Sequence, residues 1–417
     1  MQSTILQHLE KLKNDARCLS SLTEEKINSV LLDIAICATE NASSILSENR
    51  KDLERMDSAD PKYDRLLLDE NRMAGIVADL RNVARLPSPL GLTLEERILQ
   101  NGLHLKKISV PLGIVGIVFE SRPNVTFDVF SLCFKSGNAS VLKGSRDAHF
   151  SNHIIVDLMK NVLSDHGLPP LVYLAPSERE SLQYILEADQ FIDAIIPRGS
   201  QGLINYVREY SKVPVIETGA GIVHVYVDKS ADLHKAAAIV RNSKTRRVSV
   251  CNALDTLLVH SERLLDLPFI LQDFDHQFQC GIYADKFAFE VLKNGYNAHL
   301  LHPATSESFG TEFLSMNMAI RTVDSIEEAL DHIFRHSSKH TESIVAEDEG
   351  AISRFLAEVD AAVVLSNAAT CFTDGAQFGL GAEIGISTQK LHARGPMALR
   401  ELTSYKWVVR GTGQVRS

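Results

Sequence analysis

Short apolar runs alternate with amphipathic segments between residues 114 and 365, and this alternation constrains the fold more than any other feature of the sequence. The runs are rich in Val and Ile and too short for helices, as is typical of buried strands. Strands that alternate with helical segments predict parallel sheets with crossover helices. Predicted strands lie at 114–119, 139–142, 171–174, 192–196 and 213–216, and then at 256–260, 318–323, 343–346 and 361–365.

The two series of strands predict two α/β domains. A chain of 417 residues is also longer than one ordinary domain of about 150 residues. Predicted helices at 231–243, 325–335 and 348–358 separate strands of the second series. Apolar residues at helical spacing predict further helices at 23–53 and 65–85, so the N-terminal region should be helical.

A hairpin is predicted between these regions, because Asn101-Gly102 is a strong two-residue turn signal. The flanking residues 97–100 and 103–110 should form a two-stranded ribbon. Near the end of the chain, a strand-like segment at 405–410 is complementary to that ribbon. The pair predicts β-augmentation between subunits of a homo-oligomer. A glycine-rich stretch at 375–385 and a helix-favouring segment at 397–401 precede this last strand.

Charge and hydropathy exclude several classes of protein. The net charge of −10 and the pI near 5.8 argue against a nucleic-acid partner, because binding to phosphates needs a concentrated basic face. The longest apolar run, 114–119, is far shorter than the about 20 residues of a membrane span. Glu10, Lys11, Lys13 and Asp15 stand where a signal peptide has its apolar core. We expect a cytoplasmic protein without a membrane segment.

The cysteines and histidines show no metal-binding pattern. Six cysteines lie at positions 18, 37, 133, 251, 280 and 371, without a CxxC pair. Such scattered cysteines fit a reducing compartment, so we expect free thiols and neither a disulfide scaffold nor a structural zinc site. His149 and His153 have the spacing of two ligands on one helix face, but no acidic or cysteine residue accompanies them. We interpret the pair as a solvated helix face and expect no metal.

A dinucleotide is a common ligand of α/β chains, yet no GxGxxG fingerprint occurs: Gly379-Leu380-Gly381 is followed by Ile384 in place of the third glycine. Two other segments fit such a ligand. Residues 195–202 predict a buried strand, a turn at Gly199-Ser200 and a helix start, whose N–H groups would face a phosphate. Lys143 ends another predicted strand, where ligands of open sheets bind. A structural turn and a solvated lysine fit the same patterns.

The candidate nucleophile is Cys251, in the segment 244–253 (KTRRVSVCNA). It follows the cations Lys244, Arg246 and Arg247, which would favour the thiolate, the form that attacks carbonyl carbon. A small buried cysteine beside a charged surface fits the spacing as well. The other cysteines are weaker candidates: Cys18, Cys37 and Cys133 lie in apolar helical patterns, and Cys280 and Cys371 have no cationic run beside them in the sequence.

Four segments resemble the motifs of the gamma-glutamyl phosphate reductases, a family within the aldehyde dehydrogenase superfamily. They are 120–126 (ESRPNVT), 136–138 (SGN), 244–253 (KTRRVSVCNA) and 381–396 (GAEIGISTQKLHARGP). The resemblance extends over roughly residues 53–416 with the segments in the family's order, and the last segment is long enough to be specific.

The resemblance implies an aldehyde dehydrogenase-like α/β fold with two Rossmann-like parallel-sheet domains and a protruding oligomerisation β-hairpin. The implied NADP-binding domain covers 1–226 and is interrupted by the hairpin at about 93–112. The catalytic domain would cover 227–365, and 366–417 would form a return segment and an oligomerisation strand. A homo-oligomer and functional coupling to glutamate 5-kinase are also implied.

The resemblance also implies roles for single residues. Cys251 matches the family's nucleophile, and its backbone N–H would form the oxyanion hole with the Asn124 side chain. The implied NADPH-binding residues are Gly199 and Ser200 at the pyrophosphate, Lys143 at the adenosine ribose with Ser145 in the same segment, and Glu312 at the nicotinamide ribose. Cations for the substrate's phosphate and carboxylate are Arg122, Arg246, Arg247, Lys390, His392 and Arg394; for each, a surface ion pair is the alternative.

The implied reaction is the NADPH-dependent reduction of L-glutamyl 5-phosphate to L-glutamate 5-semialdehyde and phosphate, through a thioester on Cys251. This is the second step of proline biosynthesis from glutamate. Water must be excluded from such an intermediate, so Glu217, where oxidising relatives keep a general base, is either a residual base or a structural hydrogen-bonding residue. Two alternatives share the scaffold: an NAD-dependent oxidative semialdehyde dehydrogenase and a catalytically silent oligomeric binding protein.

Overall fold

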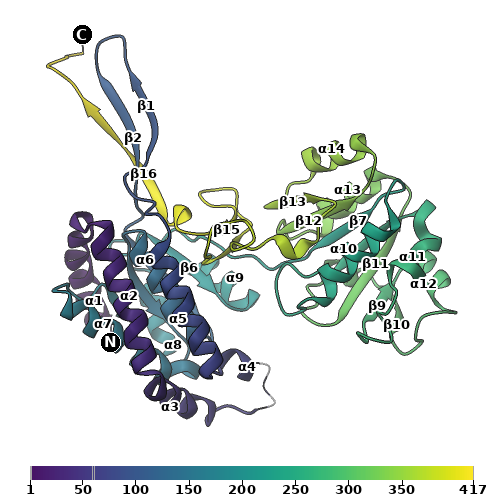
Figure 1. The fold of residues 1–417 in the computed structure, drawn as a ribbon, viewed down its shortest axis with the longest axis horizontal. Helices are drawn as coiled ribbons and strands as arrows, with labels where there is room; N and C mark the ends of the chain where they lie inside the picture. The colour runs from purple at the N-terminus through teal and green to yellow at the C-terminus, as the bar shows by residue number, and fades with distance from the viewer. Residues whose placement is uncertain (1, 59, 61, 417) are drawn as a thin grey trace. The chain divides into compact units, whose positions relative to one another are not determined.

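The structure, a computed structural model, describes residues 2–58, 60 and 62–416, and the chain divides into two compact units. Unit 1 comprises Met1–Thr218, Gly379–Gly385 and Met397–Ser417, and unit 2 comprises Gly219–Phe378 and Ile386–Pro396. Each unit contains one parallel sheet, so the predicted α/β architecture is confirmed (Figure 1).

The sheet of unit 1 has four parallel strands in the order β5-β4-β3-β6. Its strands are β3 (Ile114–Phe119), β4 (Ala139–Lys143), β5 (Val172–Leu174) and β6 (Ala194–Arg198). Its crossover helices are α6 (Asn124–Lys135), the 3-10 turn η2 (Arg146–Ala148) with α7 (His149–Asp165), α8 (Arg179–Leu186) and α9 (Gln201–Tyr210). Every residue of β3 and β4 is buried, as expected for a parallel sheet covered on both faces.

The predicted strand at 213–216 is wrong. Only Val215 bridges to the sheet, through an isolated parallel contact with Ile195. Pro214 explains the difference, because it has no N–H to donate to a ladder and offers only its carbonyl, which accepts from Ile195 N at 2.8 Å.

Helices cover the N-terminal region as predicted, but they are more broken than the sequence pattern indicated. They are α1 (Gln2–Asp15), the 3-10 helix η1 (Ala16–Ser21), α2 (Glu24–Glu40), α3 (Ala42–Leu53), α4 (Tyr63–Leu66) and α5 (Glu70–Arg85). Thr23 and Asp69 cap α2 and α5 with their side-chain oxygens, which fixes where these helices begin. Asn41 ends α2 with a φ of −101° and ψ of 13°, so the predicted helix 23–53 is two helices.

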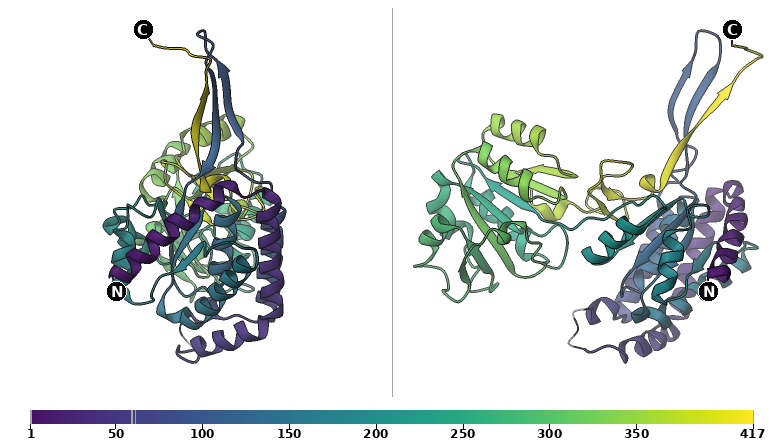
Figure 2. Two further views of the ribbon diagram at one scale, coloured as in Figure 1. Left: turned by 90° about the vertical axis from the view of Figure 1, so that its left-hand side faces the viewer. Right: turned by 180° about the vertical axis from the view of Figure 1, so that it is seen from behind.

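The predicted ribbon is present in unit 1 as β1 (Thr93–Ile98) and β2 (His104–Pro111), and β16 (Thr403–Arg410) joins it. Gly102 adopts a φ of 84° in the turn, a conformation that favours glycine. β16 pairs antiparallel with β2, with Thr403 opposite Pro111 and Arg410 opposite His104. Both views of Figure 2 show the yellow strand beside the blue hairpin (Figure 2). The last strand therefore pairs with the ribbon of its own chain.

The helix-favouring segment 397–401 is not a helix. Met397 ends a short strand, β15 (Gly395–Met397), which pairs with β14 (Gly385–Ser387). Only the 3-10 turn η6 (Arg400–Leu402) follows before β16. A few residues between two strands are too few for a stable helix, whatever their propensity.

The sheet of unit 2 has seven parallel strands in the order β10-β9-β11-β8-β7-β12-β13. They are β7 (His224–Val227), β8 (Thr256–His260), β9 (Gly281–Ala284), β10 (Leu301–Pro303), β11 (Asn317–Val323), β12 (Thr341–Val345) and β13 (Val363–Ser366). The helices are α10 (Leu233–Thr245), η3 (Ser261–Asp266), α11 (Leu267–Ile270), α12 (Lys286–Leu292), η4 (Glu307–Gly310), α13 (Ile326–His336), α14 (Glu349–Glu358) and η5 (Thr370–Phe372).

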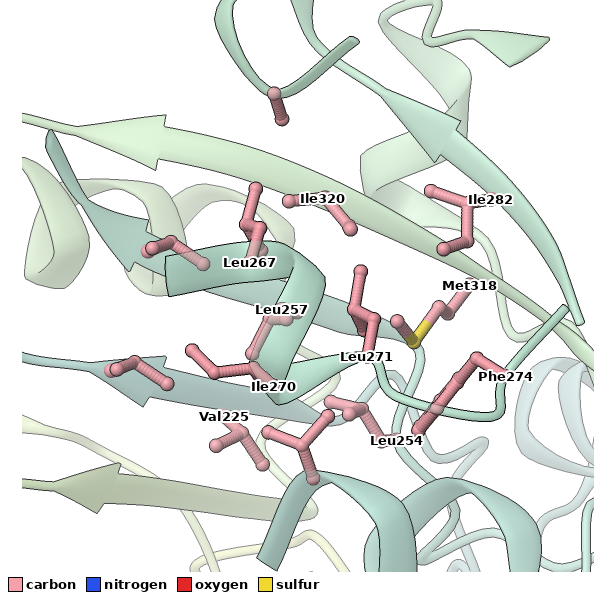
Figure 3. Close-up of a cluster of buried hydrophobic side chains, with 14 of the residues drawn as sticks. Val225, Leu254, Leu257, Leu267, Ile270, Leu271, Phe274, Ile282, Met318 and Ile320 are labelled. Atoms are coloured by element: carbon pink, nitrogen blue, oxygen red, sulfur yellow. The ribbon is translucent and has the colours of Figure 1, made fainter. Parts of the chain in front are cut away.

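Two hydrophobic clusters cover the two faces of this sheet. One cluster joins Val225, Leu257 and Ile320 to α10, α11 and α12, and Figure 3 shows these side chains beside Phe274 (Figure 3). The other joins Tyr226 and Leu258 to α13 and α14. Neighbouring residues of one strand enter opposite clusters because side chains alternate along a strand.

Within the described residues, no single helix is long and apolar enough to cross a membrane; only the bent pair α2 and α3, taken together, meets the criteria of length and composition.

Candidate active site

Cys251 lies in unit 2 on the loop between α10 and β8, just before the amino end of β8, and it is partly exposed. The loop is fixed beneath it. Lys244 Nζ donates to the Leu254 carbonyl at 2.8 Å, and Asn252 Nδ2 donates to the Thr373 carbonyl at 2.9 Å. The thiol is therefore carried by a tethered loop at the surface of the unit and is not sealed in its core.

Gly221 packs directly against the backbone of Cys251. A Cβ atom at position 221 would lie 1.6 Å from the Cys251 carbonyl oxygen and 2.8 Å from its Cα. No side chain fits there unless the backbone of residue 251 moves. Glycine is thus required by close approach at this position.

Glu312 lies on the other side of the same glycine. Gly221 N donates to Glu312 Oε1 at 2.8 Å, so one short segment contacts both the candidate nucleophile and the candidate ribose ligand. Burial raises the pKa of the Glu312 carboxyl, and the hydrogen bond from Gly221 opposes that rise. The structure therefore brings two residues far apart in the sequence to one place.

Lys244 was predicted to be one of three cations that favour the Cys251 thiolate. It is fully buried, burial lowers its pKa, and the Asp255 carboxylate opposes that change. Burial raises the pKa of Asp255 to about 7, although Lys244 and the N–H groups of Phe313 and Val223 favour its ionised form. Lys244 and Asp255 are both buried, and each favours the charged form of the other although no direct ion pair joins them.

The two arginines of the same segment are exposed. Burial raises the pKa of the Cys371 thiol, and Arg246 opposes that rise. Arg246 therefore lies near a cysteine that has no cationic run beside it in the sequence. Cys371 Sγ itself contacts Asn242 Oδ1 at 2.7 Å. Nearness in the sequence therefore did not predict that Arg246 lies close to Cys371.

In unit 1, the Gly199-Ser200 turn binds a carboxylate. Ser200 N donates to Glu120 Oε2 at 2.8 Å, Ser200 Oγ donates to Glu120 Oε1 at 3.1 Å, and Ser200 also caps α9. A Cβ at Gly199 would lie 2.7 Å from Glu120 Oε2. The Glu120 oxygens stand in for the phosphate oxygens that a helix N-terminus attracts. The turn thus binds a carboxylate of its own chain, which fits the structural alternative, and its role toward a cofactor phosphate stays a prediction.

Lys143 ends β4 and is only 6% exposed, so the alternative of a solvated lysine is wrong. Burial lowers its pKa to about 8, with Glu178 opposing the shift. Its Nζ donates to the carbonyls of Gly144 and Ser177 at 3.0 and 3.3 Å. Ser145 follows at the same strand end, and its Oγ accepts from Ser121 N at 3.1 Å.

Asn124 is the first residue of α6, and its Nδ2 donates to Asp128 Oδ2 at 3.0 Å. Burial raises the pKa of Asp128 to about 7, while the Asn124 hydrogen bond lowers it. Arg122 lies partly buried in the turn that leads into the helix. The Asn124 amide is therefore oriented by one turn of its own helix.

The remaining predicted site residues lie in ion pairs or on exposed loops. Lys390 Nζ and Arg394 share the Asp360 carboxylate at 2.9 and 2.8 Å, and they hold the pKa of that carboxyl well below its usual range. His392, between them, is exposed with a φ of 69°. In unit 1, Glu217 pairs with Arg208 at 3.6 Å.

The helical pair His149 and His153 is present on α7, with ring centroids 4.2 Å apart. Across residues 2–58, 60 and 62–416, no group of three His, Cys, Asp or Glu side chains could hold a metal ion.

Three residues of the candidate site were missed from the sequence: Glu120, Gly221 and Asp255. Each acts through contacts with residues far along the chain, which no local pattern encodes. The run Gly219-Ala220-Gly221 was the one available signal, because two glycines in a row of three small residues indicate a close backbone approach.

Comparison with known proteins shows full-length similarity to one enzyme. No family model matches the chain. The gamma-glutamyl phosphate reductase of Chlorobaculum parvum is 59% identical over 413 residues, covering 99% of this chain and 98% of that protein. The enzyme of the same name from Bacteroides fragilis is 57% identical over 401 residues, with 96% of each chain covered. The crystal structure of the Thermotoga maritima gamma-glutamyl phosphate reductase has a TM-score of 0.94 at 37% identity and covers 99% of both chains.

More distant structures share the fold alone. An acetylating aldehyde dehydrogenase from Geobacillus thermoglucosidasius has a TM-score of 0.69 at 19% identity, covering 100% of this chain and 98% of the other. The two parallel sheets and these neighbours define the aldehyde dehydrogenase fold, and the full-length relatives identify an oxidoreductase. Within that class, the chain belongs to the gamma-glutamyl phosphate reductase family.

Proposed function

We propose that this protein reduces L-glutamyl 5-phosphate to L-glutamate 5-semialdehyde and phosphate, with NADPH as the reductant and a thioester on Cys251 as the intermediate. The observation that carries the proposal is the contact of Gly221 with both Cys251 and Glu312. Gly221 thereby places the partly exposed Cys251 close to Glu312, the residue that by family resemblance would hold the nicotinamide ribose. The reaction would be the second step of proline biosynthesis from glutamate.

In the proposed first step, the Cys251 thiolate attacks the acyl carbon, a C–S bond forms, and the C–O bond to phosphate breaks. Phosphate leaves with the electron pair of that bond and takes up a proton. The developing oxyanion would accept from the Cys251 N–H and the Asn124 amide. Asn124 already has its side chain oriented by Asp128.

Several residues of unit 1 fit a dinucleotide. Ser200 N and Oγ bind a carboxylate, Lys143 is buried at a strand end, and Ser145 lies beside it. When bound, the reduced nicotinamide supplies the hydride that converts the thioester to the aldehyde. The chain's own residues would then orient the acyl group and exclude water. When the C–S bond breaks, its electron pair would stay on sulfur, so that Cys251 is regenerated as the thiolate.

The substrate is anionic, so we assign Arg122, Arg246, Arg247, Lys390, His392 and Arg394 to its phosphate and carboxylate. Lys390 and Arg394 now share Asp360, so in this proposal the substrate competes with that carboxylate. Glu217 is given a structural role, because its carboxylate pairs with Arg208.

Other parts of the proposal concern the whole protein. We assign the cofactor to 1–226 outside the ribbon, the catalytic cysteine to 227–365, and the return segment and final strand to 366–417. The protein would act as a cytoplasmic homo-oligomer. Glutamate 5-kinase would supply its unstable acyl phosphate.

The test is NADP-dependent oxidation of glutamate semialdehyde, the reverse reaction, with and without phosphate. We expect turnover only with phosphate, and none for Cys251→Ala, while Cys371→Ser retains activity as a matched control. Equal turnover without phosphate would indicate an oxidative dehydrogenase that uses water. Turnover with NAD alone would reject NADPH as the reductant.

A further inference from the structure

Unit 2 contains a cavity of about 530 Å³ that includes none of the residues assigned to the reaction. It lies beside α13, the loop after β10 and the end of β11. Its volume is in the range of about 300–1,000 Å³ that small-molecule sites occupy. Asp285 and Ala304 follow the carboxyl ends of β9 and β10, whereas Cys251 precedes the amino end of the parallel strand β8.

Three cations and three carboxylates line the cavity, but only one cation is in an ion pair with a carboxylate of the lining. Lys286 and Arg321 form no ion pair with any residue that the structure describes, and the Arg321 guanidinium lies 5.6 Å from the Phe309 ring centroid. Arg335 is paired with Asp331 at 2.7 Å. Two cations therefore remain free to bind an anion.

The acidic groups of the lining are already bound to the protein. Asp285 accepts from the N–H groups of Phe287, Ala288 and Thr322 as the cap of α12. Glu328 Oε2 accepts from Asp324 N at 2.9 Å. These carboxylates keep their charge, but their oxygens are directed to backbone donors and form no ion pair with Lys286 or Arg321.

Two histidines complete the lining. His332 is only 6% exposed, and its Nε2 has no hydrogen-bond partner in the described part of the chain. Its ring centroid lies 4.5 Å from that of His336 and 5.4 Å from that of Phe309. Burial lowers the pKa of His332, and His224, His336, Arg321 and Arg335 lower it further. The Nε2 atom of His332 is inaccessible to solvent, so this ring forms part of the cavity wall, whereas the half-buried His336 can reach a ligand.

We propose that this cavity binds a phosphate-bearing small molecule, with Arg321 and Lys286 as the charged donors and the imidazole of His336 as a further N–H donor. Arginine offers a planar fork that matches phosphate oxygens, and lysine adds a mobile point charge. Phe309 forms the apolar wall against which Arg321 packs. The site is separate from the nucleophile, so its ligand is an effector and not the substrate.

The test is equilibrium dialysis of the full-length protein with radiolabelled inorganic phosphate as the probe. Phosphate is also a product of the proposed reaction, so the wild type should bind two phosphates per chain, and the variants below should affect only the site in this cavity. We expect Arg321→Gln and Lys286→Gln each to weaken this binding roughly ten- to a hundredfold, because a charged hydrogen bond contributes about 1.5–3 kcal/mol. Arg241→Gln and Lys293→Gln, exposed cations on other parts of unit 2, should bind phosphate like the wild type. Thermal melting checks that each variant is folded.

A second readout locates the ligand. In protein labelled with ¹³C-histidine, phosphate should shift the imidazole resonances that are lost in His332→Gln and His336→Gln, and it should still do so in Cys251→Ala. The proposal is overturned if Arg321→Gln binds phosphate as tightly as the wild type, or if those resonances do not move. Equal displacement of phosphate by acetate would also overturn it, since the site would then recognise carboxylates. Cys251→Ala should lose reductase activity but keep phosphate binding in the cavity. The cavity proposal and the proposed reaction can therefore fail independently.

Discussion

Gly221 occupies a position where the smallest side chain would collide with the backbone of Cys251. We predict that Gly221→Ala lowers kcat/KM for the phosphate-dependent reaction about 100-fold, because an ångström-scale displacement of a reacting group has an effect of that size. The alkylation rate of Cys251 by iodoacetamide should change as well, since the thiol moves with its backbone.

The matched control is Gly295→Ala, in the same unit, where an added Cβ meets nothing within 4 Å. It should leave both rates at their wild-type values. Wild-type kinetics in Gly221→Ala would show that the backbone at residue 251 relaxes freely, contrary to the contact described.

Glu120 occupies the anion position at the start of α9. If a cofactor phosphate takes this position, the carboxylate must leave first. We therefore predict that Glu120→Ala tightens NADPH binding about tenfold, the equivalent of one charged hydrogen bond. NADPH fluorescence titration measures the effect, with Glu10→Ala on α1 as the control. Weaker binding by Glu120→Ala would mean that Glu120 assists the cofactor and does not compete with it.

Asp255 gives stability a pH dependence. Its folded-state pKa is raised to about 7, above the value near 3.8 of an unperturbed Asp. The stabilisation from its protonated form is present in full below about pH 4 and is lost as pH rises through about 7. Relative to Asp255→Asn, the wild type should lose free energy of unfolding across that window in urea titrations. Asp157→Asn, an exposed control, should keep the wild-type slope because Asp255 is intact. Equal slopes in the wild type and in Asp255→Asn would contradict the prediction.

At the same scale, the sequence identified residues whose chemistry is local. Cys251 and the Ser200 turn could be found because a reactive residue type follows a recognisable loop or strand. Glu120 and Gly221 could not, since their importance depends on partners 80 and 30 residues away or more. The orientation of Lys244, inward to Asp255, depends on the burial of α10, which the charge pattern did not show.

Among the elements, the ribbon with β16 is the clearest candidate for an interface. Tyr405, Trp407 and Val409 alternate along β16 and are 53%, 41% and 52% exposed. Lys107 Nζ lies 3.7 Å from the Tyr405 ring centroid, so the lysine covers only part of this face. Exposed apolar side chains in a row indicate an association surface.

We predict that removing residues 403–417 abolishes the homo-oligomer while both parallel sheets stay folded, because β16 contributes to neither sheet. Light scattering after size exclusion measures the mass, and circular dichroism the fold. Removing only 412–417, beyond the end of β16, is the control and should leave the oligomer intact. An oligomer that survives the longer truncation would place the interface elsewhere.

Element prediction succeeded where apolar runs were long. The strands β3, β8 and β11 match their predicted ranges closely, as do the helices α13 and α14. The strands β7, β9 and β10 were missed, since each has only three or four residues and is held by neighbouring strands, two for β7 and β9 and one for the edge strand β10. Tertiary neighbours, and not local propensity, make such short segments extended.

For the whole molecule, the alternation of strands and helices predicted two parallel-sheet units, and the structure and its relatives confirm that fold. The order of the strands could not be predicted from the sequence, because parallel pairing joins segments that are far apart along the chain. For example, β7 lies between β8 and β12. Periodicity did not show the chain's return to unit 1 at Gly379–Gly385, whereas the family resemblance implied a return segment within 366–417. Family motifs supplied the chemistry that periodicity alone left open.

The most direct measurement of the thioester chemistry is a rapid-mixing experiment with glutamate semialdehyde and NADP, without phosphate. The wild type should release about one NADPH per chain and then stop, with a glutamyl group attached to Cys251 in peptide mass spectra. Added phosphate should restore turnover and remove the adduct. Continued turnover without phosphate, or a burst in Cys251→Ala, would contradict the assignment of Cys251 as the acyl carrier.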